Sequence, residues 1–182
     1  EGTMNPKNSY ITQLKKAHAE HKKWLNQVRL VVSGIVDKTD TIPVDATQTP
    51  FGMWLYAKGL VFTTIRTSEV IAEIEQLYQE CYDIYLKIYA LLGNKKKGLL
   101  AFWVQPAYAN SAELHAAQEY YETLVGIADA LSQKLRVLEA QMAATSESQF
   151  EPFGNLEEPK EKPEEVKAPT KRYYYRGTII EE

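Results

Sequence analysis

The sequence has little of what several common classes of protein require. Its only cysteine is Cys81, so no disulfide can form within the chain, which fits a reducing compartment such as the cytoplasm. No apolar run approaches the ~20 residues that cross a bilayer, so we expect no membrane insertion. The net charge is −3 and the basic residues are scattered. Because a nucleic-acid-binding protein presents a broad basic face, we also expect no nucleic-acid partner.

Signatures of catalysis are missing as well. The sequence contains no Gly-rich phosphate loop, no serine elbow and no Ser/His/Asp set. Its clustered acids, Glu73, Glu75 and Glu80, are typical of a solvated helix face and have no partner base nearby in the sequence. These absences predict a protein that is not an enzyme.

What the sequence does contain is apolar residues at intervals of three and four, which predict helices. The predicted helices cover residues 8–37, 50–62, about 67–92 and 110 to about 145. The last of them has the most regular spacing, as in a helix that packs lengthwise on partners. The lengths of the loops allow antiparallel neighbours, so we expect an all-α, antiparallel up-down four-helix bundle over residues 8–146, with a short second helix.

The character of the chain changes after residue 146. Residues 147–169 are proline-rich and acidic, and they are predicted to be a disordered linker because they cannot bury enough apolar surface. Residues 170–182 form a β-prone, aromatic terminal segment. Its residues Tyr173, Tyr174, Tyr175 and Arg176 are predicted to bind a protein partner, for example by adding a strand to a sheet edge. An adaptor role for this tail is one hypothesis for the function.

The most distinctive string is Phe51-Gly52-Met53-Trp54-Leu55-Tyr56. Glycine early in a helix costs about 1 kcal/mol relative to alanine, so Gly52 indicates a close approach by another group. That group is either the first helix, in tight packing, or a ligand or metal held beside the second helix. The third helix carries an aromatic series, Tyr78, Tyr82, Tyr85 and Tyr89. This series also has two interpretations: it packs in the core, or it forms a platform that binds a ligand.

Together these motifs resemble the chemoreceptor zinc-binding domain family, over roughly residues 10–145. That family has a histidine followed three residues later by tryptophan, as in His21 and Trp24 here. It has a Cys-x-(Phe/Leu)-Gly-x-Trp-(Leu/Tyr)-Tyr motif, to which the string Thr49–Tyr56 is similar. Its third helix carries two histidines four residues apart. The resemblance implies a cytoplasmic sensory or regulatory input module of bacterial signalling, linked to chemotaxis and often a homodimer.

The family's zinc ligands are three histidines and one cysteine, and three of the four differ here. The matching positions are His21, Thr49, Tyr78 and Tyr82. A hydroxyl and two neutral phenols are poor zinc ligands. The departure implies a retained scaffold without a cofactor, in which these side chains hydrogen-bond one another, for example His21 with Tyr78 or Tyr82. A rearranged zinc site using His21, Cys81 and His115 is the alternative.

Overall fold

The computed structural model describes residues 5–35, 41–64, 68–93, 111–154, 173–175 and 178–180. Its α-helices are α1 (Pro6–Val32), α2 (Pro50–Ala57), α3 (Ser68–Leu92) and α4 (Ser111–Ala144). Short 3₁₀ helices are η2 (Ala46–Gln48), η3 (Gly59–Thr64), η5 (Glu147–Gln149) and η6 (Glu151–Phe153). The expectation of an all-helical domain is confirmed for the described residues up to 154.

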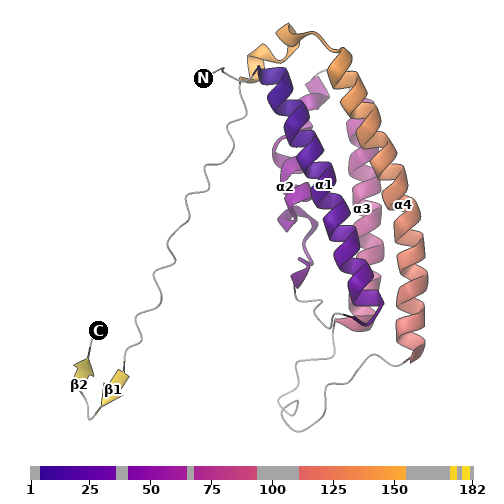
Figure 1. Cartoon of the computed structure of the whole chain (residues 1–182), viewed down its shortest axis with the longest axis vertical. Coiled ribbons are helices and arrows are strands. Elements are labelled where there is room, and N and C mark those ends of the chain that lie inside the picture. Colours follow the sequence, from indigo (N-terminus) through magenta and orange to yellow (C-terminus); the bar gives the residue numbers. More distant parts are fainter. Residues whose placement is uncertain are drawn as a thin grey trace.

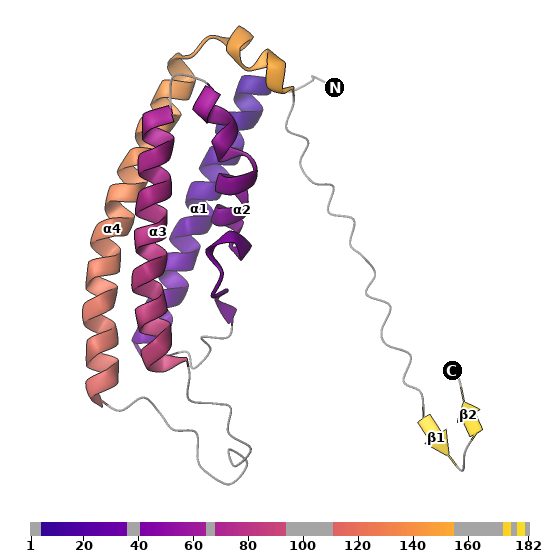
Figure 2. The same cartoon turned by 180° about the vertical axis from the view of Figure 1, so that it is seen from behind.

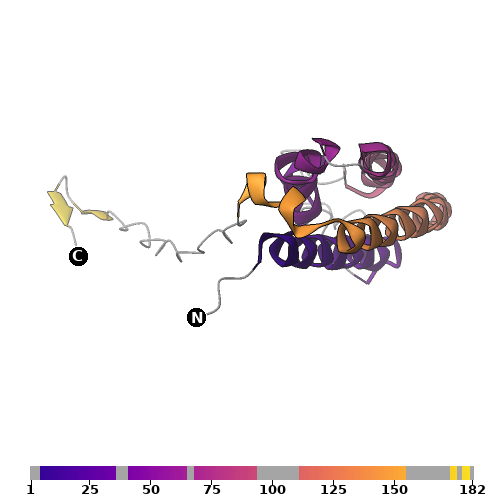
Figure 3. The same cartoon turned by 90° about the horizontal axis from the view of Figure 1, so that it is seen from above.

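The three long helices lie side by side, and α2 with its flanking turns covers the remaining side. Following the colours in Figures 1 and 2, α1 and α3 run in one direction, whereas α4 runs back against both of them. In the view from above, α2 lies between α1 and α3 on one side of the bundle, and α4 lies between them on the opposite side (Figure 3). Every long helix therefore contributes a face to one shared core.

The first helix is shorter than the sequence predicts. Asn5 caps its start by accepting a hydrogen bond from the Lys7 amide at 2.9 Å, and Pro6 occupies the first turn. The helix ends at Val32 because Gly34 takes a left-handed conformation, with φ 73°. Ile35, an apolar residue within the predicted helix 8–37, lies past this end and is 74% exposed. The prediction of a helix to residue 37 is therefore wrong.

The second helix also stops early. It ends at Ala57, and the chain continues as η3 up to Thr64, which buries Phe62. The third helix begins at Ser68 and ends before Gly93, as predicted. On α4 the regular apolar spacing coincides with buried positions, which include Leu124, Ala128, Leu131, Leu135 and Leu138.

The helical domain extends past residue 146, where the sequence predicted its end. Phe150 has 0% exposure, and its ring centroid lies 5.8 Å from that of Tyr10 on α1. The hydroxyl of Tyr10 donates to the carbonyl of Phe153 at 3.4 Å. The Lys7 ammonium donates to the carbonyls of Ala143 and Thr145 at 2.6 and 2.8 Å, which satisfies the C-terminal end of α4. Residues 147–154 are thus part of the domain and not of a disordered linker.

The rest of the predicted linker, residues 155–169, lies outside the described residues. In the terminal segment, β1 (Tyr173–Tyr175) and β2 (Thr178–Ile180) pair as antiparallel strands. Tyr173, Tyr174 and Tyr175 form β1, whereas Arg176 lies outside the described residues. Within the described part of the chain, no helix is both long enough and apolar enough to cross a membrane.

Because Phe150 is fully buried against α1, replacing it should leave a cavity. We expect Phe150→Ala to lower the free energy of unfolding by about 3–5 kcal/mol, measured by urea denaturation. The matched variant Phe153→Ala, at a partly buried ring, should cost less. No loss for Phe150→Ala would show that residues 150–153 do not belong to the core, and equal losses for the two variants would contradict their different burial.

Candidate functional site

Three segments bring the four predicted site residues together. His21 comes from the middle of α1, Thr49 from the turn before α2, and Tyr78 and Tyr82 from successive turns of α3. The ring centroids of His21 and Tyr78 are 6.1 Å apart, and those of Tyr78 and Tyr82 are 5.4 Å apart. The hydroxyl oxygens of Thr49 and Tyr78 are separated by 2.6 Å. The resemblance therefore selected residues that share one buried region.

Three tyrosines of α3 hold the segment before α2 through its backbone. Tyr85, Tyr82 and Tyr78 donate to the carbonyls of Ile42, Pro43 and Ala46, respectively, at 3.3, 3.1 and 2.7 Å. Steps of four and three residues place these phenols on one face of α3. We call this set the tyrosine clasp. It satisfies carbonyls of a segment that is in neither a long helix nor a sheet, which explains why phenols and not phenyl rings are present.

Thr49 connects the tyrosine clasp to α2. Its hydroxyl oxygen accepts the amide N–H of Gly52 at 2.9 Å, which makes Thr49 the N-cap of this helix. One arrangement uses each proton once: Thr49 donates to the oxygen of Tyr78, and Tyr78 donates to the carbonyl of Ala46. Thr49 therefore has a structural role as the N-cap of α2 and as a partner of Tyr78.

Gly52 is required by a close approach, but not the one predicted. A Cβ atom at this position would lie 1.9 Å from the carbonyl oxygen of Ala46 and 3.0 Å from the hydroxyl oxygen of Tyr78. The sequence predicted either the first helix or a ligand or metal as the neighbour, whereas the nearest group is the backbone of η2. The small residue thus lets α2 fold back onto the turn that precedes it.

His21 does not join this hydrogen-bond network. Its side chain is 1% exposed, and its Nε2 atom has no hydrogen-bond partner among the described residues. The ring stacks on Trp24 with centroids 5.4 Å apart and lies 5.1 Å from the ring of Phe51. The predicted hydrogen bond from His21 to Tyr78 or Tyr82 is therefore wrong, because both phenols donate to carbonyls of residues 43–46.

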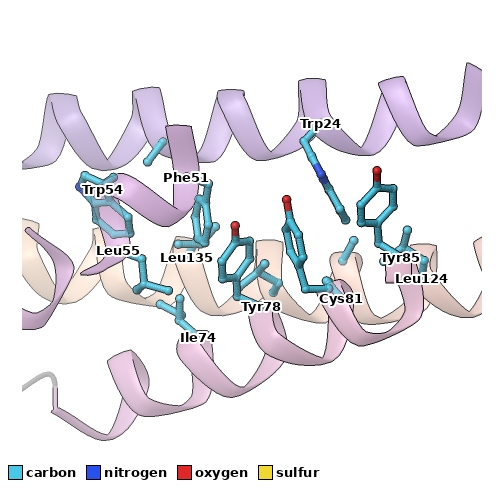
Figure 4. Close-up of a cluster of buried hydrophobic side chains, with 14 of the residues drawn as sticks. Trp24, Phe51, Trp54, Leu55, Ile74, Tyr78, Cys81, Tyr85, Leu124 and Leu135 are labelled. Atoms are coloured by element: carbon cyan, nitrogen blue, oxygen red, sulfur yellow. The ribbon is translucent and has the colours of Figure 1, made fainter. Parts of the chain in front are cut away.

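Aromatic contacts complete the surroundings of the site. Phe51 lies between Trp54 and Tyr78, with centroid distances of 5.7 and 4.8 Å. Figure 4 shows Phe51 of α2 next to Tyr78, and Trp24 of α1 extending toward Tyr85. Tyr56, the last residue of the motif, is only partly buried, and its hydroxyl accepts from Gln79 at 3.5 Å. The motif is therefore mostly the packing surface of α2.

The ionisable groups of this region are neutral at pH 7. Burial, followed by the nearby charge of His18, lowers the pKa of His21 to about 4. Burial raises the pKa of each phenol of the tyrosine clasp well above its ordinary value. Burial also raises the pKa of the Cys81 thiol to about 12. In these protonated forms the thiol and the phenols are poor zinc ligands, because zinc prefers thiolate, neutral imidazole and carboxylate groups.

The alternative zinc ligands are not brought together. His115 is 75% exposed near the start of α4, where its Nε2 lies 3.4 Å from Glu119. His21 and Cys81 are instead fully buried. In the ranges that the structure describes, no three metal-ligating side chains form a cluster.

Sequence reasoning missed the backbone partners of the tyrosines. Ile42, Pro43 and Ala46 contribute through carbonyl oxygens, which carry no sequence signal of their own. The available signal was the spacing of Tyr78, Tyr82 and Tyr85 on one helix face. Comparisons with family models, with curated proteins and with solved structures found no match, so the site is interpreted from its geometry.

The two glycines of the α-helices test the close approach at Gly52. We expect Gly52→Ala to destabilise the protein by about 1–3 kcal/mol, because the Ala46 carbonyl must move. Gly126 lies inside α4 with nothing within 4 Å of an added Cβ, so Gly126→Ala should instead stabilise by about 0.5–1 kcal/mol. Thermal and urea denaturation measure both changes. A neutral or stabilising Gly52→Ala substitution would contradict the contact with η2.

His21 should make stability depend on pH. Its pKa of about 4 in the folded chain lies below the ordinary value of 6.5, so the unfolded chain binds the proton more tightly. The contribution of neutral His21 is complete above pH 6.5 and is lost as the pH falls toward 4, by on the order of 3 kcal/mol.

Urea denaturation at several pH values measures this effect as a difference between variants. In His21→Leu the loss between pH 6.5 and 4 should shrink by roughly that amount. His18, whose pKa is also lowered by burial, hydrogen-bonds Ser132 at 3.0 Å and is the matched control. His18→Gln should retain most of the loss. An unchanged pH profile in His21→Leu would show that the imidazole is not buried in its neutral form.

Proposed function

We propose that residues 5–154 form a non-catalytic regulatory module with the architecture of an antiparallel up-down four-helix bundle. In this proposal the segment 41–64, which contains α2, serves as the short second helix. The directions of α1, α3 and α4 support this topology (Figures 1 and 2). So does the packing of α2 against α1 together with that of η3 against α3.

One observation carries the proposal: the side chains at the former ligand positions hold the protein's own backbone. Thr49 caps α2, while Tyr78 and Tyr82 donate to the carbonyls of Ala46 and Pro43. In a zinc-binding relative of this scaffold, the ion would join α1, the turn before α2 and α3. Here hydrogen bonds make the connection between that turn and α3. The position of α2 is thus set without a metal.

The module acts through the position of segment 41–57. The long helices bury continuous apolar faces, whereas this segment is held by a few hydrogen bonds and by Phe51, Trp54 and Leu55. Packed helices change between discrete arrangements and not continuously. Binding of a partner to this segment would therefore be transmitted to α1 and α3 as a change in helix packing, which suits a sensory or regulatory input role.

The chemistry of the site supports a non-catalytic role. General acid–base catalysis uses groups whose pKa lies near the working pH. Burial moves the pKa of His21 down and those of Cys81, Tyr78 and Tyr82 up, so all four stay in one protonation state near neutral pH. These pKa shifts are the ones expected for side chains that pack in a buried core.

Restoring the family's ligands tests the proposal. We expect the triple variant Thr49→Cys/Tyr78→His/Tyr82→His, together with His21, to bind one zinc ion per chain, because these positions lie in one buried region. Zinc should then raise the melting temperature of the variant. Metal content and the visible absorption of the cobalt-substituted protein measure the binding. Adding His21→Ala to the triple variant is the control and should abolish tight binding.

The unsubstituted chain should bind no stoichiometric zinc, and its melting temperature should not respond to zinc or to a chelator. Circular dichroism establishes that each variant remains helical. A helical triple variant that fails to bind metal would contradict the relation to the zinc-binding scaffold. Stoichiometric zinc held by His21 in the unsubstituted chain would contradict the assignment of a metal-independent clasp.

A further inference from the structure

The exposed side of α1 carries a concentration of positive charge. Six basic residues lie within Pro6–Val32, against one acidic residue, Glu20. Two pairs of adjacent lysines stand seven residues apart, which is two helical turns or about 10 Å along the axis, so both pairs lie on the same side of the helix. All four residues are exposed, and we call them the lysine patch: Lys15, Lys16, Lys22 and Lys23.

The protein itself engages these lysines only weakly. The ammonium group of Lys15 lies 3.2 Å from the carboxylate of Glu139 on α4, and that of Lys23 lies 2.9 Å from the carboxylate of Glu20. The two lysine side chains are 62% and 72% exposed. Ion pairs this exposed contribute little to stability, so both ammonium groups are available to another anion.

The opposite side of the domain is acidic. The helix α3 carries five acidic residues and one basic residue within Ser68–Leu92. In the view from above, α2 and α4 separate α1 from α3 (Figure 3). A negatively charged surface would therefore attract the side of the domain that carries α1 and repel the side that carries α3, which would orient the domain.

The environment of His18 reflects the same positive charge. Burial, followed by the charges of Lys22 and Arg136, lowers the pKa of His18, whereas the charge of Glu139 raises it. His18 lies between α1 and α4, where its ring hydrogen-bonds Ser132 at 3.0 Å. The edge of the lysine patch that borders α4 is thus net positive despite the carboxylate there.

The lysine patch has no apolar component. Within Pro6–Val32, all of which the structure describes, no large hydrophobic side chain is exposed. Interfaces between proteins depend on a few apolar or aromatic side chains that become buried in pockets of the partner. Because the lysine patch offers no such side chain, it suits a partner that is recognised by charge.

The lysine patch is also narrow, with a carboxylate on each side. Glu139 borders it on the side of α4. Glu20 lies seven residues after Gln13, which accepts a hydrogen bond from Lys58 at the end of α2, so Glu20 borders it on the side of α2. A nucleic-acid duplex, whose phosphates flank a groove on both sides, would bring phosphates near these carboxylates. A flat anionic surface meets only the exposed crest of the helix.

We propose that the lysine patch binds the domain to the surface of a lipid bilayer that contains anionic phospholipids. The four ammonium groups would contact headgroup phosphates, with the axis of α1 parallel to the membrane plane. Each lysine near such a surface strengthens binding by roughly fivefold. Because α1 has no exposed apolar face, it would not enter the hydrocarbon, and the attachment would be reversible and sensitive to salt. This inference concerns a different surface from the tyrosine clasp and does not rest on the proposed regulatory role.

Co-sedimentation of the full chain with sucrose-loaded vesicles tests the proposal. The vesicles contain phosphatidylcholine alone or with about one third phosphatidylglycerol, which supplies the anionic headgroups. We expect binding to the anionic vesicles at low salt and little binding to phosphatidylcholine. The anionic vesicles should release the chain at about 0.5 M salt, where the Debye length falls to roughly 4 Å.

Two double variants locate the contact. In the part of the chain that the structure describes, Lys16 and Lys22 form no ion pair, so Lys16→Gln/Lys22→Gln should keep the fold and lower the partition coefficient roughly 20-fold. The control Lys87→Gln/Lys134→Gln removes the same charge from α3 and α4 and should change the partition coefficient less than about twofold. Circular dichroism and thermal melting verify the fold of each variant.

The proposal is wrong if the anionic vesicles fail to bind the chain, or if the two double variants lose equal affinity. Binding that persists at high salt would show apolar insertion instead. Tighter patch-dependent binding to a DNA duplex or to polyglutamate than to the vesicles would assign the lysine patch to nucleic acid or to an acidic protein. The lysines lie on the exposed side of α1 and His21 on its buried side, so these results are independent of the zinc experiment.

Discussion

The position of α2 depends on hydrogen bonds between phenol side chains of α3 and backbone carbonyls of residues 42–46. This segment passes over the core outside the long helices, so its carbonyls need partners that the segment cannot supply itself. Tyr78, Tyr82 and Tyr85 supply them. With the segment fixed, Thr49 caps α2, Gly52 contacts the Ala46 carbonyl, and Phe51 reaches the ring of Tyr78. The contacts of α2 therefore depend on the tyrosines that fix this segment.

The sequence predicted the helical class and most of the core because periodicity reports directly on burial. The spacing on α4 and the Gly93 stop of α3 match the structure. Helix ends were less predictable, since Val32 ends α1 through the conformation of Gly34 and not through an apolar pattern. Phe150 was assigned to the linker because its neighbours are polar, and only its contact with Tyr10 reveals that it is core.

The sequence predicted that four residues of the candidate site lie near one another, but it did not predict their hydrogen bonds. The resemblance grouped His21, Thr49, Tyr78 and Tyr82, and the structure places them together. It gave no information on which atoms bond, because a side chain pattern cannot show that the phenols choose carbonyls over imidazole. His21 is left with aromatic neighbours, and its Nε2 atom has no hydrogen-bond partner in the part of the chain that the structure describes, which is unfavourable for a buried polar atom. Among these four residues, His21 is the one that packing explains least.

The contacts of Lys7 and Tyr10 with residues 143–153 bring the start of α1 and the exit of the tail to the same end of the domain (Figure 1). A pull on the tail would therefore reach the Phe150 ring and the first turns of α1 before it could load the rest of α4. Tension would peel this end open sequentially and would not shear the three long helices at once. A load applied through the tail would thus act first where the tail begins, at a point remote from the tyrosines of α3.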